Sequence, residues 1–215
     1  AQCIIDIRSG ATGSVSDEVP AWLSQFQFES EVSIEKEKEA LAANLARLAQ
    51  NLSRLNEWKR ILSCNEPQLL KLVKEILKDF FGLETEDIPD ADLPACRLMH
   101  NGSFLGILSV SACEGDISRA QLNEIDSLRE RLNLSAPTPV WNILNDHTQL
   151  LDFAQRQSAT LSREKLEHAH YLRIGVFRSV DFLVLMKKLE GKTPAERARE
   201  FLRLLQDARG LIRAA

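Results

Sequence analysis

The sequence predicts an α/β protein: a mixed sheet flanked by helices and preceded by a long coiled-coil helix. After Asn65, short apolar runs alternate with amphipathic segments, which is typical of alternating strands and helices. Asn101-Gly102 separates two of these apolar runs, and this dipeptide is the strongest short signal of a β-hairpin. Before Asn65, leucines recur every three or four residues within residues 31–63, which favours a helix that pairs with another helix.

Length and charge limit the function classes. The chain has 215 residues, of which 44% are hydrophobic, enough for one domain core plus an appendage. Its formal net charge is -4, so it lacks the overall basic field of a dedicated DNA-binding protein. No apolar run approaches the roughly 20 residues that span a bilayer, and no secretory signal is visible. We therefore expect a cytoplasmic protein without membrane contact, and, since the chain lacks an initial Met, a fragment of a longer one.

Cysteine spacing gives no sign of a metal or redox site. The four cysteines form no CxxC pair, and no His lies at zinc-ligand spacing from one of them. We expect buried, reduced thiols and neither a cofactor nor a metal ion. The cysteines are Cys3, Cys64, Cys96 and Cys113.

The N-terminal part divides near residue 31. Residues 1–30 are interpreted as a strand followed by an irregular stretch with Gly and Ser. Residues 31–63 contain no Gly or Pro and are rich in helix-favouring residues. Ile34 and the leucines follow an a/d seam that Lys38 and Lys59 interrupt. We expect this seam to pair two copies of the chain as a homodimer; the alternative is an amphipathic helix packed on its own domain. The predicted pairing residues are Leu41, Leu45, Leu48, Leu52, Leu55 and Leu62.

Local signals place the later elements in order. A helix capped by Asn65 ends at Gly82, an acidic stretch follows, and two strands flank the Asn-Gly turn. Capping residues and apolar periodicity predict the elements that follow, and the final helix opens with a Thr193/Glu196 capping box. These elements are a helix opening at Asp116 or Ser118, a strand at Val140–Leu144, a helix at Arg163–Leu172, a strand at Arg173–Phe177, a helix capped by Ser179 and ending at Gly191, and a last helix ending at Gly210.

The order of elements and the residues at their joints resemble the PD-(D/E)xK restriction-endonuclease-like superfamily, over roughly residues 63–189. NEPQLLKLVKEILKDFFGLETED resembles the family's opening helix and following strand. DADLPACRLMHNGSFLGILSVSACEGDISRAQLNEIDSL resembles its metal-binding hairpin and crossover helix. PVWNILND resembles the next core strand, and RIGVFRSVDFLVLMKKLEG the closing strand and helix. The resemblance implies a restriction-endonuclease-like domain over residues 64–192, with residues 193–215 as a C-terminal helix.

The resemblance also implies where a nuclease site would lie. Family enzymes hold Mg²⁺ with an Asp at the start of the hairpin and a carboxylate on its second strand, followed two residues later by Lys. Asp92 fits the first position, but Ser109 and Ser111 stand where the carboxylate and the Lys belong. Glu66 and Glu114 are weak remnants. A neutral hydroxyl is a poor Mg²⁺ ligand and cannot supply the lysine charge, so we expect a catalytically inactive pseudonuclease.

Three functional interpretations follow. The first is an inactive nuclease-fold domain with a structural, regulatory or nucleic-acid-associated interaction role inside a larger protein. The second is an Mg²⁺-dependent nuclease with a relocated site that uses Asp92 and Glu114. The third is a protein–protein adaptor or oligomerisation module, which the acidic pI of about 5.7 favours over a strong DNA binder. Another protein partner, and weak binding of nucleic acid, stay open at this point.

Overall fold

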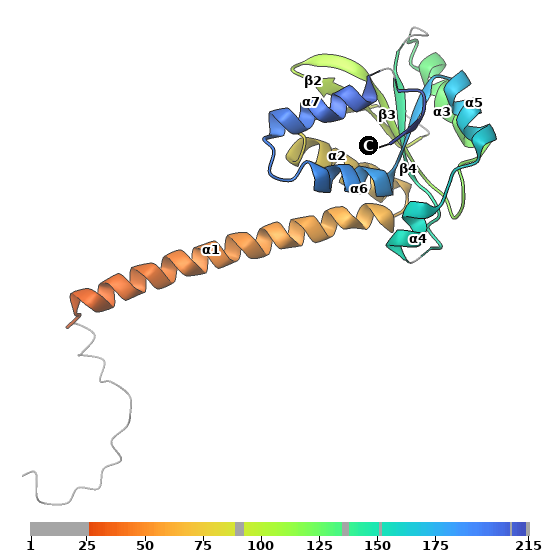
Figure 1. The fold of residues 1–215 in the computed structure, drawn as a ribbon. Coiled ribbons are helices and arrows are strands. Elements are labelled where there is room, and N and C mark those ends of the chain that lie inside the picture. The colour runs from red at the N-terminus through yellow and green to blue at the C-terminus, as the bar shows by residue number, and fades with distance from the viewer. Residues whose placement is uncertain (1–25, 89–92, 135–137, 151, 207, 214–215) are drawn as a thin grey trace, which may run out of the picture. The chain divides into compact units, whose positions relative to one another are not determined.

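The computed structural model describes residues 26–88, 93–134, 138–150, 152–206 and 208–213. The strand and irregular stretch expected in residues 1–25, and the candidate Asp92, lie outside the described residues. The described part is an α/β protein with a six-stranded mixed sheet flanked by helices and a long N-terminal helix, as predicted (Figure 1). The chain divides into two units, residues 1–52 and 53–215.

The long helix α1 spans Glu29–Lys59, and a turn of 3-10 helix follows at Arg60–Leu62. This confirms the helix expected over residues 31–63. Acidic residues in its first turn and Lys59 in its last turn complement the helix dipole. Trp58 is the buried residue of α1, and the rest of the helix is exposed or half-buried.

One sheet organises the later unit. Its strands lie in the sequence order β1-β2-β3-β4-β5-β6. The pairs β1–β2 and β2–β3 are antiparallel, whereas the pairs from β3 to β6 are parallel. The strands are β1 (Glu84–Asp87), β2 (Ala95–His100), β3 (Ser103–Ala112), β4 (Val140–Asn145), β5 (Ile174–Arg178) and β6 (Gly210–Ile212).

The predicted hairpin is confirmed. Asn101 and Gly102 connect β2 to β3, with His100 facing Ser103 across the ladder. Both turn residues have positive φ, 50° for Asn101 and 73° for Gly102, which is the backbone geometry of a type I′ turn. Asn and Gly tolerate this conformation better than other residues, so the dipeptide fixes the register next to the turn. The register shifts between Leu98 and Met99, where Met99 faces Phe104 and Leu98 faces Gly106.

Helices cover both faces of the sheet. In Figure 1, α2, α6 and α7 lie on one face, and α3 and α5 lie on the other. The expected caps Asn65 and Ser118 accept hydrogen bonds at the starts of α2 and α3, and the Thr193/Glu196 capping box opens α7. The helices are α2 (Glu66–Asp79), α3 (Arg119–Arg131), α4 (Phe153–Ser158), α5 (Arg163–Tyr171), α6 (Ser179–Lys188) and α7 (Pro194–Leu205).

A phenylalanine cluster fixes the first face. Phe81, Phe177, Phe182 and Phe201 are fully buried, and the ring centroids of Phe81 and Phe201 lie 4.6 Å apart. The cluster joins β5 to α6, α7 and the end of α2, and each buried ring contributes on the order of 2 kcal/mol through burial alone. The second core, on the other face, is aliphatic and lies under α3 and α5.

Trp141 of β4 occupies a gap between two glycines on the neighbouring strands. A Cβ atom at Gly106 would lie 2.5 Å from the Pro139 carbonyl oxygen and 2.7 Å from the indole ring. At Gly175, which pairs with Trp141 in the ladder, it would lie 2.8 Å from the ring. The indole Nε1 donates to the Leu205 carbonyl at the end of α7, so this residue ties the sheet to the last helix.

The structure differs from the sequence prediction at two helix ends. The C-terminal helix expected within residues 193–215 ends at Leu205 rather than Gly210, because Gly210–Ile212 pairs with β5 as strand β6. Ser179 does not cap α6: the N-cap is Arg178, and the Ser179 hydroxyl instead donates to Asn145 Oδ1 at 3.1 Å. The short helix α4 was not predicted.

Candidate functional site

The two serines at the nuclease-like positions belong to a buried triad. Ser109 and Ser111 point from β3 toward Asn142 of β4, and each hydroxyl lies 3.2 Å from Asn142 Oδ1, to which it can donate. Ser109 faces Asn142 directly in the parallel ladder. The exposed fractions are 1%, 5% and 0% for Ser109, Ser111 and Asn142. These positions therefore support strand pairing inside the domain and do not line an open site.

The other candidate carboxylates are not brought together by the described residues. Glu66, at the start of α2, accepts a hydrogen bond from the Ala112 backbone N–H through Oε1 at 3.1 Å. This contact joins the helix start to the end of β3. Glu114 is exposed, and Asp92 lies outside the described residues. Within the described ranges, no group of three or more His, Cys, Asp or Glu side chains is placed to hold a metal ion.

A buried ion pair lies at the carboxyl ends of the parallel strands, the edge where open α/β sheets place ligand sites. Asp146 directly follows β4 and Arg178 ends β5. Arg178 Nε donates to Asp146 Oδ2 at 2.7 Å, and the side chains are 5% and 0% exposed. Arg178 also donates to the backbone carbonyls of Arg156 and Ala159, at 2.6 and 2.8 Å. The guanidinium thus holds the chain around α4 against the sheet edge.

Arg156 of α4 extends this network. Its guanidinium donates to the backbone carbonyl of Asp146 at 2.7 Å, to Asn145 Oδ1 and to the Leu62 carbonyl. Asn145 in turn donates from Nδ2 to the Cys64 carbonyl at 3.2 Å. Burial, the largest effect, lowers the pKa of Arg156 below its usual value. Most polar groups of the network are occupied by one another, which indicates a structural role.

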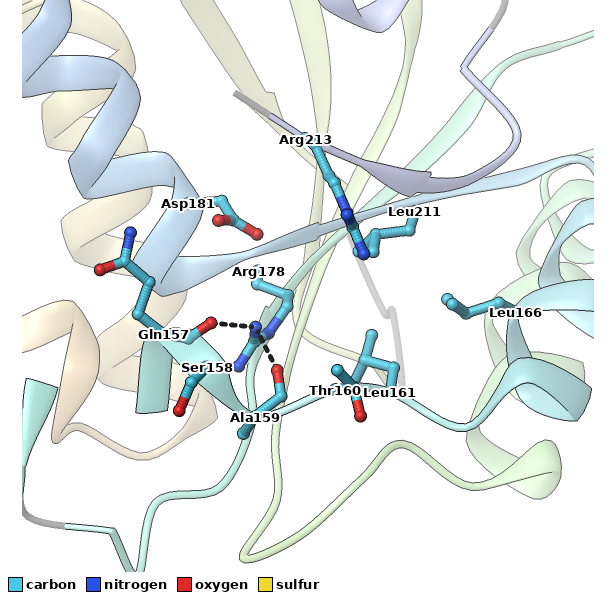
Figure 2. Close-up of a pocket in the computed structure, with 10 residues that line it drawn as sticks. All are labelled: Gln157, Ser158, Ala159, Thr160, Leu161, Leu166, Arg178, Asp181, Leu211 and Arg213. Carbon is cyan, nitrogen blue, oxygen red and sulfur yellow. Dashed lines mark hydrogen bonds between the residues drawn. The ribbon is translucent and has the colours of Figure 1, made fainter. Parts of the chain in front are cut away.

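A cavity of about 320 Å³ opens beside this network, as Figure 2 shows. Arg178 and Arg213 flank it, together with Asp181 of α6 and the hydroxyl groups of Ser158 and Thr160. Burial raises the pKa of Asp181, and the nearby guanidinium groups of Arg178 and Arg213 oppose that shift. Among the described lining residues there is no Cys, His or Lys.

The described cysteines are free but chemically quiet. Burial raises the pKa of Cys96 to about 12 and that of Cys113 to about 11, and it also raises the pKa of Cys64. Because the thiolate is the nucleophile, these thiols react slowly near neutral pH. Cys64 and Cys96 are buried, as expected, whereas Cys113 is half-buried, and Cys3 lies outside the described residues.

The apolar face of α1 is exposed. Five leucines and one isoleucine of the predicted seam are exposed, although such side chains are usually inside. Leu62 behaves differently, because it is half-buried and packs against the first core. The exposed residues are Ile34, Leu41, Leu45, Leu48, Leu52 and Leu55, with exposed fractions from 39% to 72%.

In comparisons with known proteins, no protein-family model, curated protein or solved structure matches the chain. Among the described helices, none combines the length and apolar character that a membrane crossing requires.

Proposed function

We propose that this chain is a catalytically inactive α/β domain that self-associates through α1, as an interaction module of a larger protein. One observation carries the proposal: the seam from Ile34 to Leu55 is exposed, and it is apolar at every a and d position except Lys38. Apolar area removed from water contributes about 25 cal/mol per Å², so leaving this face exposed costs several kcal/mol per chain. A second helix of the same kind covers such a seam well.

The buried triad of Ser109, Ser111 and Asn142 supports the absence of catalysis in this proposal. Family nucleases hold Mg²⁺ with carboxylates. Here, Ser109 and Ser111 present hydroxyl groups that are turned toward Asn142 and closed off from solvent. A metal ion placed there would have to displace this packing and would find no anionic ligand on β3.

A restriction-endonuclease-like fold is part of this proposal. A helix followed by three strands, a crossover helix and a fourth strand is the order of elements that the resemblance implied, and α2 to β4 follow this order. This support is architectural and carries no activity by itself. The free, weakly acidic thiols fit a cytoplasmic location, where thiols stay reduced.

Co-purification of tagged and untagged chains tests the self-association. Two co-expressed copies of the parent chain are expected to purify together on the tag, and Leu48→Asp with Leu52→Asp in both copies is expected to abolish this. Ala43→Asp with Gln50→Asp is the matched control, because it adds the same charge on the opposite side of the helix. Equal recovery of the leucine and control variants would contradict the proposal, provided that urea unfolding shows the α/β unit folded in both.

A further inference from the structure

The charge of α1 is divided between its two ends. Residues 29–46 carry five Glu and two Lys, a net charge of -3. Residues 47–62 carry three Arg, one Lys and one Glu, a net charge of +3. The helix dipole accounts only for the charges in the terminal turns, since its effect fades within one turn. Glu35, Glu37 and Arg47 lie further in and need another explanation, whereas Arg54 lies over the Trp58 ring, 5.2 Å from its centroid.

We infer that two copies of α1 pair antiparallel, with Leu45 of one copy facing the partner's Leu48. The inference rests on the proposed self-association and adds its orientation and register. Antiparallel pairing lays the acidic half of each helix beside the basic half of the other. Parallel pairing would place the acidic half beside the partner's acidic half and the basic half beside the partner's basic half. Like charges across an interface are unfavourable.

The heptad positions of the seam residues define which residues face each other in an antiparallel pair. Leu45 and Leu52 occupy a positions, and Leu41 and Leu48 occupy d positions. In an antiparallel pair, a positions face d positions. The register therefore gives Leu45 opposite the partner's Leu48, and Leu41 opposite the partner's Leu52, with the same contacts repeated by symmetry. Four consecutive layers are then Leu against Leu.

The two lysines of the seam distinguish the orientations more sharply. Lys38 and Lys59 also fall on a positions. In a parallel pair, each would face its own copy, placing two ammonium groups together in each of two layers. In the antiparallel register, Lys38 lies opposite the partner's Leu55, and Lys59 opposite the partner's Ile34. Each lysine can then lay its apolar stem over the seam and keep its ammonium group in water.

The flanks of the seam agree with the same register. Ala42 and Ala49 take e positions, and Asn44 and Asn51 take g positions. Antiparallel pairing places Ala42 beside the partner's Ala49 and Asn44 beside the partner's Asn51. Small residues meet small residues, so the helices approach closely, and the two amides can hydrogen-bond. Parallel pairing would instead bring Asn44 beside the partner's Ala49.

Disulfide trapping tests the orientation. Single cysteines are placed by Lys38→Cys in one chain and Leu55→Cys in another, in the full chain with Cys3→Ser and Cys113→Ser. The two variants are mixed under reducing conditions and then oxidised, with one carrying a size tag. We expect a covalent heterodimer from the mixture and no covalent dimer from either variant alone. At about 1.5 Å per residue, positions 38 and 55 of one helix lie about 25 Å apart, too far for a bridge in a parallel pair.

A matched control uses Lys36→Cys mixed with Glu57→Cys. These positions lie at equivalent heights in the proposed register but face away from the seam, so no bridge is expected. Covalent homodimers from the Lys38→Cys and Leu55→Cys variants alone would show parallel pairing, which overturns this inference and leaves self-association standing. A chain that stays monomeric, with no bridge in any combination, would overturn both.

Discussion

Replacing Arg178 by Met tests whether the buried network at the strand ends holds the domain together. The change keeps an unbranched side chain in place of the aliphatic part of Arg178 and removes the guanidinium. It leaves the Asp146 carboxylate fully buried, with Oδ2 deprived of its 2.7 Å partner. Asp146 Oδ1 already lacks a hydrogen-bond partner among the described residues. Removing one member of a buried ion pair costs about 3–5 kcal/mol, and this is the destabilisation that we expect.

Urea unfolding near neutral pH measures this cost. Small domains are stable by about 5–15 kcal/mol, so the variant is expected to stay folded with a much lower midpoint. Adding Asp146→Leu removes the unpaired carboxylate and should recover part of the lost stability. The double variant should therefore be destabilised by less than the sum of the two single changes. An Arg178→Met variant within about 1 kcal/mol of the parent chain would refute the reasoning, as would strictly additive effects of the two changes.

Three further predictions concern titration, salt and catalysis. The pKa of Asp181 is raised by burial from 3.8, so the folded state binds the proton more tightly and loses stability as the pH rises from 3.8 through the folded pKa. The Asp181→Asn variant should therefore have a higher urea midpoint than the parent chain near neutral pH, and this difference should disappear below pH 3.8. Equal urea midpoints near neutral pH would contradict the raised pKa of Asp181. Raising NaCl from about 0.05 to about 0.5 M should weaken self-association, because salt screens the attraction between the acidic half of one helix and the basic half of its partner; salt that strengthens it would favour parallel pairing. No cleavage of DNA or RNA above background is expected with Mg²⁺ or Mn²⁺, and cleavage that disappears with Asp92→Ala or Glu114→Ala would establish the relocated site.

Features with a local cause were predictable from the sequence. Asn101-Gly102 dictates its turn through backbone conformations that few other residues accept, and the hairpin lies where it was expected. Asn65 and the Thr193/Glu196 pair cap helices through contacts within three residues along the chain. The apolar face of α1 likewise follows from heptad spacing, whereas the exposure of this face comes from the structure.

Features that depend on distant partners were not predictable. Arg156 and Arg178 bind backbone carbonyls, which every residue offers, so no residue pattern marks their partners. Asn142 stands in an apolar strand, and only the ladder register brings it beside the two serines. Sequence reasoning identified Ser109 and Ser111 as replaced catalytic positions, but their burial and their shared acceptor come from the fold.

Sedimentation equilibrium of the unmodified chain tests the central claim most directly. We expect a second copy of the chain to cover the exposed face of α1. A species of twice the 24.2 kDa chain mass should therefore dominate at micromolar concentration. The mass should fall toward that of a single chain on dilution. A single 24.2 kDa species throughout the micromolar range, with the α/β unit folded, would contradict the account.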